Sequence, residues 1–292
     1  MNSLKFSKLS GYGFLLPYIT LFSVFLMGPV IFGALLSFLR WEMLSPAPPE
    51  FVQFSNYKEA FTSDYFWKAL WATIRFVILA VPITVAFALL ISVGINAIPN
   101  KRQNFYRALA FLPGMITISV VGILWRWFFN SEFGLFNAIL GNWGMKIPWL
   151  TSQTWAMKSI VFMTLWWTIG GPVVIFIAGL KQIPFQYYEA ASIDGATAIQ
   201  KFRHITLPLL KPILQFVLIL NIIGSFQVFG QTFMVTRGGP ELSTRVLVQY
   251  IYETAFRDYR MGYGAALSWI LFAIIVVFSI TYYKISQEKK NA

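Results

Sequence analysis

Two long apolar runs of this chain are separated by the stretch Tyr188-Glu189-Ala190-Ala191-Ser192-Ile193-Asp194-Gly195-Ala196, which continues to Ile205-Thr206-Leu207-Pro208. Alanine and glutamate favour a helix, Gly195 permits a sharp turn, and Pro208 fits the first turn of a following helix. The pattern therefore predicts a short helix outside the membrane, a break at Gly195, and then the start of the next membrane span. An ordinary loop helix is the simpler interpretation of the same residues.

The composition is that of a protein that crosses a membrane several times. Of the 292 residues, 57% are hydrophobic and 12% are charged, whereas charged residues make up about 25% of a soluble domain. The mean hydropathy is +0.64. These values predict an all-α membrane protein.

The composition also excludes several kinds of site. The chain has no Cys and one His, His204, so thiolate and histidine-rich metal sites are excluded. It has no G-x-x-x-x-G-K-[ST] phosphate loop, so it does not hydrolyse ATP by that route. The net charge of +12 is spread over short loops without a nucleic-acid-reading motif. We therefore expect no catalytic residue, no metal or other cofactor, and no nucleic-acid partner for this chain.

Hydropathy divides the chain into six predicted spans within one domain. After a cytosolic N-terminus over 1–11, a single transmembrane domain is predicted over 12–292. Its spans are expected at about 12–39, 67–98, 105–129, 155–180, 209–235 and 262–283. Trp125 and Trp127, at the end of the third span, are typical of an interfacial aromatic belt.

The distribution of charge predicts the orientation of these spans. The N-terminus, the 99–108 turn, the 181–211 loop and the C-terminus together carry 12 Lys and Arg residues and three acids. The other three loops carry eight basic residues and eight acids. Because cytosolic loops are enriched in Lys and Arg, the first set is predicted to be cytosolic. Both termini and the loop that contains Glu189 would then face the cytosol.

The 188–208 stretch also resembles the EAA loop of ATP-binding-cassette importer permeases. That pattern is E-A-A, then D-G-A four residues after the first Ala, then I-x-L-P about ten residues after the Gly, and every part is present here. Further segments are similar to carbohydrate-uptake permeases, and to the first of the two membrane subunits of maltose-type importers. They are Phe54-x-Asn56-Tyr57, Phe105-Tyr106-Arg107, Phe111-x-Pro113, Thr236-x-Gly238-Gly239-Pro240 and Gly262-Tyr263.

The resemblance implies a fold, a function and partners. The fold would be a six-helix type I importer permease of the MetI-like kind in the inner, or cytoplasmic, membrane. Its EAA loop, 187–208, would be a coupling helix docked on an ATPase, with coupling residues Glu189, Ala190, Ala191, Asp194, Gly195 and Ala196. Glu189 is expected to pair with a basic ATPase residue, Gly195 to allow the turn, and Asp194 to act as a local cap. The partners would be a second homologous permease, two ATPase subunits that bind ATP and Mg, an extracytoplasmic solute-binding protein, the sugar and the lipid bilayer.

Polar side chains within the spans are candidates for the sugar pathway. Such residues usually face the bundle interior or a cavity. Asn221, Ser225 and Val228 are spaced i, i+4, i+7 on one helix face, and Gln227 and Gln231 form a second i, i+4 pair. The candidates are Asn221, Ser225, Gln227 and Gln231 in the fifth span and Trp167 and Thr168 in the fourth. The same polar residues could instead bridge helices, and Gly170 and Gly171 are predicted to allow close helix packing.

The sequence thus predicts a permease subunit of a binding-protein-dependent sugar importer. A glycerol-phosphate or polyol importer remains an alternative, although Arg75, Arg126 and Lys158, the three cations not counted with the loops, lie toward span ends. A membrane enzyme acting on lipid-linked sugars would need paired acids, which the outer loops lack. A secondary transporter would usually carry an intramembrane carboxylate, and no Asp or Glu lies within the six spans.

Overall fold

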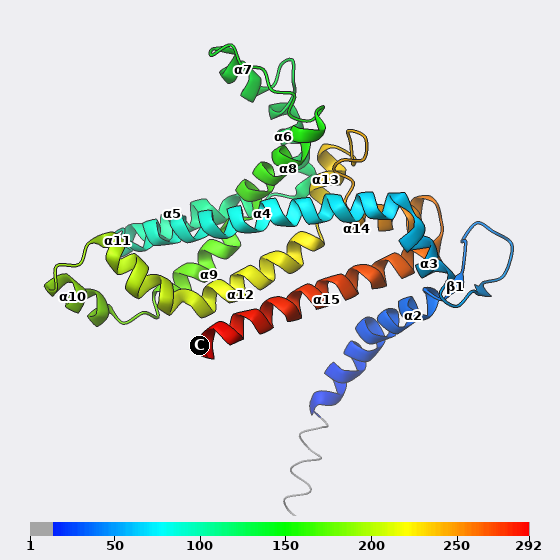
Figure 1. Ribbon diagram of the computed structural model, residues 1–292, viewed down its shortest axis with the longest axis horizontal. Helices are drawn as coiled ribbons and strands as arrows, with labels where there is room; N and C mark the ends of the chain where they lie inside the picture. The colour runs from blue at the N-terminus through cyan, green and yellow to red at the C-terminus, as the bar shows by residue number, and fades with distance from the viewer. Residues whose placement is uncertain (1–13, 292) are drawn as a thin grey trace, which may run out of the picture. The chain divides into compact units, whose positions relative to one another are not determined.

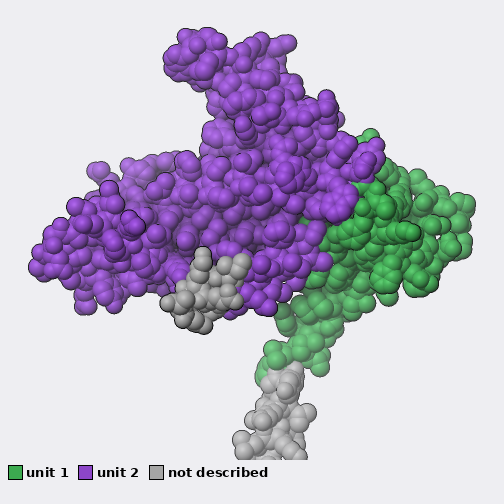
Figure 2. Space-filling model, viewed as in Figure 1, with its two compact units in different colours: residues 1–63, 251–272 green, residues 64–250, 273–292 purple. Residues whose placement is uncertain are grey.

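The computed structural model describes residues 14–291, with side chains described through residue 284. Its elements are almost all helices, whose order along the chain is shown in Figure 1. Contacts between Cα atoms divide the chain into two compact units, which Figure 2 colours separately. The first unit contains 1–63 and 251–272, and the second contains 64–250 and 273–292. The single domain over 12–292 stays a prediction.

Four helices among the described residues are long and apolar enough to cross a membrane. They are Phe14–Leu36, Asp64–Asn96, Ala198–Phe226 and Met261–Lys284. Two further helix pairs meet the same criterion together, but each pair is bent. The described chain therefore has four straight candidate spans, or up to six if each bent pair counts as one.

The third predicted span, 105–129, is not one straight helix. The segments Asn100–Met115 and Ile118–Phe128 meet at an angle of 92°. Pro113 lies in the 3₁₀ turn between them and has no N–H to donate, and Thr117 then has an extended backbone with ψ of 145°. Hydropathy predicts the apolar length of this span and not the direction of its helices, so the bend is visible only in the structure.

The fourth and fifth predicted spans are also interrupted. Gln153–Thr168 and Gly170–Leu180 are bent by 50°, next to Pro172, which cannot donate a hydrogen bond to the Thr168 carbonyl. The fifth span, predicted over 209–235, begins earlier, within a helical run from Ala198, and its helix ends at Phe226. A separate short helix follows at Gly230–Val235.

The first unit contains helices and strands from two separate parts of the chain. They are η1 (Ser23–Met27), α2 (Gly28–Leu36), β1 (Leu39–Arg40), β2 (Glu50–Phe51), α3 (Ser55–Thr62) and η4 (Glu253–Arg257), and the unit also takes residues from α14 (Leu247–Tyr252) and α15 (Met261–Asn291). The two strands pair antiparallel, with Leu39 opposite Phe51 and Arg40 opposite Glu50.

Asn56 and Gly262 belong to the segments that resemble carbohydrate-uptake permeases, and both make close contacts within this unit. Asn56 is 6% exposed, and its side-chain amide donates to the Ser37 carbonyl at 2.9 Å and to the Leu39 carbonyl at 3.0 Å. These bonds satisfy carbonyls just beyond the end of α2. A Cβ at Gly262 would overlap the Leu39 carbonyl oxygen, so only glycine allows this approach.

The second unit is arranged around the 33-residue helix α4, Asp64–Asn96. Its other elements are α5 (Asn100–Phe111), η2 (Leu112–Met115), α6 (Ile118–Phe128), α7 (Leu135–Gly141), α8 (Gln153–Thr168), α9 (Gly170–Leu180), α10 (Phe185–Ile193), α11 (Ala198–Lys201), η3 (Phe202–Thr206), α12 (Leu207–Phe226) and α13 (Gly230–Val235). In Figure 1, α4 runs along α9 and α12.

Two apolar cores pack against successive parts of α4. The first core includes Phe76 of α4 with Trp125 of α6 and Met157 of α8. The second includes Val85 of α4 with Phe176 of α9 and Leu210 of α12. Because α4 contributes to both cores, it fixes α8, α9 and α12 relative to one another.

The prediction of an interfacial belt is wrong for one of its two tryptophans. Trp125 is 5% exposed, and its ring lies 5.2 Å from that of Phe129 and 5.5 Å from that of Trp166. Trp127, two residues further on, is 50% exposed. The bend before α6 turns one face of that helix inward, so Trp125 packs in the core.

Candidate functional site

A cavity of about 350 Å³ lies within the second unit, in contact with α4, α8, α9 and α12. Its lining residues are Phe76, Thr164, Thr168, Gly171, Pro172, Ile175, Val217, Leu220, Asn221, Gly224, Ser225, Val228 and Gln231. Four predicted pathway residues are therefore brought together: Asn221, Ser225, Gln231 and Thr168.

The polar wall of this cavity follows from helical spacing. Asn221 and Ser225 are one turn apart on α12 and present their side chains to the same side. The Asn221 amide donates to the Val217 carbonyl at 2.9 Å, which fixes its orientation and leaves its carbonyl oxygen available. The Thr168 hydroxyl donates to the Thr164 carbonyl at 2.8 Å and can still accept a hydrogen bond.

The remaining wall is apolar, and none of the lining residues is ionisable. Phe76 and Val228 are buried at 1% and 3% exposure and also belong to the first core. Val228 lies beyond the end of α12 at Phe226, so it lines the cavity from the break after the helix and not from the predicted i, i+4, i+7 helix face. Such a surface can bind hydroxyl groups on one side and the apolar face of a ring on the other.

Two predicted pathway residues lie elsewhere. The Trp167 indole N–H donates to the Ile116 carbonyl at 2.9 Å, and the ring packs against the first core. Gln227 is exposed and forms the C-cap of α12. Neither residue lines the cavity, so the structure places Trp167 at the bend before α6 and Gln227 at the end of a helix.

The two adjacent glycines of the fourth span have different environments. A Cβ at Gly170 would lie 2.6 Å from the Ala110 carbonyl oxygen and 2.6 Å from the Phe111 Cα. A Cβ at Gly171 would have nothing within 4 Å, and Gly171 lines the cavity. Gly170 therefore allows close helix packing, whereas Gly171 leaves space in the cavity.

The predicted coupling loop is a short helix followed by a glycine turn. Helix α10 covers Phe185–Ile193, so Glu189, Ala190 and Ala191 are helical and Asp194 is its C-cap residue. Gly195 has φ of +78°, a left-handed conformation in which a side chain is strained. The next turn, α11, is closed by a capping box between Thr197 and Gln200.

Exposed apolar residues flank this turn, and sequence reasoning missed them. Ile193 is 87% exposed and Ile199 is 78% exposed. They lie on either side of Asp194, Gly195 and Ala196, which together line a shallow cavity of about 390 Å³. Their side chains add apolar surface on both sides of the turn. Their signal in the sequence is isoleucine within a predicted polar loop.

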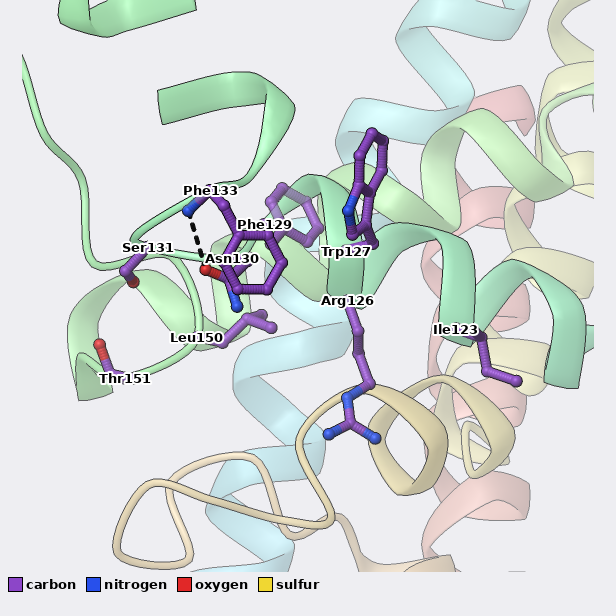
Figure 3. A pocket seen from close by; sticks show the side chains of 9 residues that line it. All are labelled: Ile123, Arg126, Trp127, Phe129, Asn130, Ser131, Phe133, Leu150 and Thr151. Carbon is purple, nitrogen blue, oxygen red and sulfur yellow. Dashed lines mark hydrogen bonds between the residues drawn. The ribbon is translucent and has the colours of Figure 1, made fainter. Parts of the chain in front are cut away.

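A third cavity lies at the end of α6 and is drawn in Figure 3. Its volume is about 380 Å³, and its lining includes Arg126, Trp127 and Asn130. The Asn130 side-chain oxygen accepts hydrogen bonds from the backbone N–H groups of Glu132 and Phe133 at 2.9 and 3.1 Å. None of the predicted pathway residues lines this cavity, whereas four of them line the cavity of about 350 Å³.

The chain has helices long and apolar enough to cross a membrane and a partly polar cavity among them. The family of binding-protein-dependent transport system inner membrane components matches residues 66–290, and this chain belongs to it. The chain is accordingly a membrane transport subunit and not an enzyme. The resemblance noted in the sequence is thereby confirmed.

Individual relatives are similar over nearly the whole chain. SmoG, the sulfoquinovosyl glycerol transport system permease protein of Agrobacterium fabrum (strain C58), is 34% identical over 94% of this chain and 89% of its own length. AraP, the arabinooligosaccharides transport system permease protein of Bacillus subtilis (strain 168), is 33% identical over 97% of this chain and 90% of its own length.

A solved structure confirms the predicted fold. It is the crystal structure of a bacterial alginate ABC transporter in complex with an alginate pentasaccharide-bound periplasmic protein. One of its chains matches 98% of this chain with a TM-score of 0.85 at 23% identity, and the match covers 96% of that chain. The all-α, MetI-like importer fold is therefore shown.

Proposed function

We propose that this chain is the permease subunit through which an ATP-driven, binding-protein-dependent importer passes an uncharged saccharide. The main support for this proposal is the cavity of about 350 Å³, which has no ionisable lining residue. It brings together four polar residues, Asn221, Ser225, Gln231 and Thr168. Relatives whose names include sulfoquinovosyl glycerol and arabinooligosaccharides support a carbohydrate, and the absence of charge is argued from the cavity lining alone. A neutral sugar offers many hydroxyl groups and no charge, which matches amide and hydroxyl partners.

Within this proposal, the polar and apolar walls have separate tasks. Asn221, Ser225 and Gln231 exchange hydrogen bonds with sugar hydroxyls, while Phe76 and Val228 contact the apolar faces of the rings. Trp167 holds the bend before α6, and we assign it no contact with the sugar. A glycerol-phosphate importer is less well supported, since no cation lines the cavity.

The 187–208 loop is proposed to dock on an ATPase that binds ATP and Mg. Glu189 is exposed and can pair with a basic residue, and Ile193 and Ile199 supply apolar contact area. We further propose that a second permease, two ATPase subunits and an extracytoplasmic binding protein complete the importer. The charge distribution supports an inner-membrane orientation with both termini and this loop in the cytosol.

Uptake of labelled sugar by cells or proteoliposomes that contain the complete importer tests the pathway. Asn221→Ala and Ser225→Ala each remove a hydrogen-bonding partner, so the KM for uptake should rise about two- to tenfold. Gln227→Ala is the matched control, because Gln227 is on the same segment but outside the cavity, and its KM should stay at the wild-type value. Equal effects at all three positions would contradict the proposed pathway.

A further inference from the structure

Four side chains connect α10 to the helical run that leads into α12. The Tyr188 hydroxyl lies 2.9 Å from the Thr206 hydroxyl. The Lys201 ammonium donates to the Ser192 hydroxyl at 2.7 Å, and that hydroxyl donates to the Tyr188 carbonyl at 2.6 Å. We call Tyr188, Ser192, Lys201 and Thr206 the loop clasp.

One end of the loop clasp, Thr206, lies where the fifth membrane helix begins. Thr206 is 6% exposed and is the last residue of the π-helical segment η3, directly before α12. The run Ala198–Phe226 is helical over 29 residues and includes Asn221 and Ser225. The 19 positions from Thr206 to Ser225 span about 28 Å at 1.5 Å per residue. One continuous helical run therefore joins the loop clasp to the wall of the cavity.

Without the loop clasp, α10 would be joined to the helical run Ala198–Phe226 mainly through the Gly195 turn. Gly195 has φ of +78° and nothing within 4 Å of a built Cβ, so the turn is open. A single flexible connection lets one element rotate without moving the other. A second connection on the far side of the turn makes the two elements move together.

The two halves of the loop clasp differ in strength. Ser192 is exposed, so water competes for its bond to Lys201 and that bond adds little. The Tyr188–Thr206 bond is partly buried, with Thr206 shielded from water. The latter bond is therefore the more effective connection.

We propose that the Tyr188–Thr206 hydrogen bond transmits the displacement of α10 to α12 and so to the cavity wall. Tyr188 and Thr206 are then positioning residues: they touch neither sugar nor nucleotide, and they act through α12. The inference rests on the proposed function, because it needs an ATPase that moves α10.

The test uses the complete importer reconstituted in proteoliposomes, with uptake and ATP hydrolysis measured on the same sample. Tyr188→Phe removes only the hydroxyl, and Thr206→Val replaces it with a methyl group. Sugar transported per ATP hydrolysed should fall about two- to tenfold in each variant, with unchanged amounts of co-purified ATPase and a Tm lowered by no more than about 6 °C. The double variant should fall no further than the more affected single variant.

Tyr187→Phe is the matched control. Tyr187 precedes Tyr188 and is 54% exposed, and its hydroxyl has no hydrogen-bond partner among the described residues. Its transport per ATP should equal the wild-type value. A normal ratio in both Tyr188→Phe and Thr206→Val would overturn the inference while the importer function stands. Loss of the ATPase from the Tyr188→Phe complex would also overturn it, since Tyr188 would then act in docking. If the wild-type importer shows no ATP-coupled uptake, the proposed function itself fails.

Discussion

Replacing Gly170 with alanine should destabilise the chain through one contact between backbones. The new Cβ would lie 2.6 Å from the Ala110 carbonyl oxygen and 2.6 Å from the Phe111 Cα. Since these are backbone atoms, the end of α5 must shift, and overpacking of this kind costs about 1–3 kcal/mol. Alanine gains at most about 1 kcal/mol over glycine in a helix. With that full gain the net loss is up to about 2 kcal/mol, or a Tm lower by up to roughly 8 °C.

Thermal unfolding of the purified chain in detergent, followed by tryptophan fluorescence, measures this loss. Gly171→Ala is the matched control, because its Cβ meets nothing within 4 Å. Its Tm should equal or slightly exceed the wild-type value, even though it narrows the cavity that Gly171 lines. If Gly170→Ala unfolds at the same temperature as Gly171→Ala or above it, the packing argument is refuted.

Three further predictions concern other parts of the chain. Asn56→Ala should cost about 1–3 kcal/mol of stability, because it leaves the Ser37 and Leu39 carbonyls without their donor; an unchanged Tm would contradict this. Gly195→Val should reduce sugar uptake per ATP, because φ at this position is +78°. Gly195→Asn should retain more of this uptake, since asparagine tolerates a left-handed backbone. Equal uptake per ATP in the two variants would argue against a role for the turn. The hydrogen bond and charge of Glu59 raise the pKa of Arg260. The stability that comes from a raised pKa is fully present below the pKa of the unfolded state and is lost only as pH rises through the pKa of the folded state. Both pKa values of Arg260 lie above pH 9, so the small loss of Tm in Glu59→Gln should be the same at about pH 6 and about pH 9. A loss of Tm at only one of these pH values would contradict this prediction.

The sequence by itself determined the class of protein. The lengths of the apolar runs, the excess of basic residues in alternate loops and the spacing within 188–208 are properties of the chain in one dimension, and they predicted a permease of this family. The pairing of Asn221 with Ser225 was also predictable, because residues four apart on a helix share a face.

Tertiary structure decided which of the candidate residues meet. Trp167 and Thr168 are adjacent in sequence, yet Thr168 lines the cavity while Trp167 donates to the Ile116 carbonyl, 51 residues away. Likewise, the break after Phe226 allows α13 to lie against α6, where a Cβ at Gly122 would meet the Met234 side chain at 2.6 Å. Neither outcome can be read from hydropathy, because both depend on the directions that the helices take after their bends. The Tyr188–Thr206 bond is of the same kind, since it joins residues that only the Gly195 turn brings together.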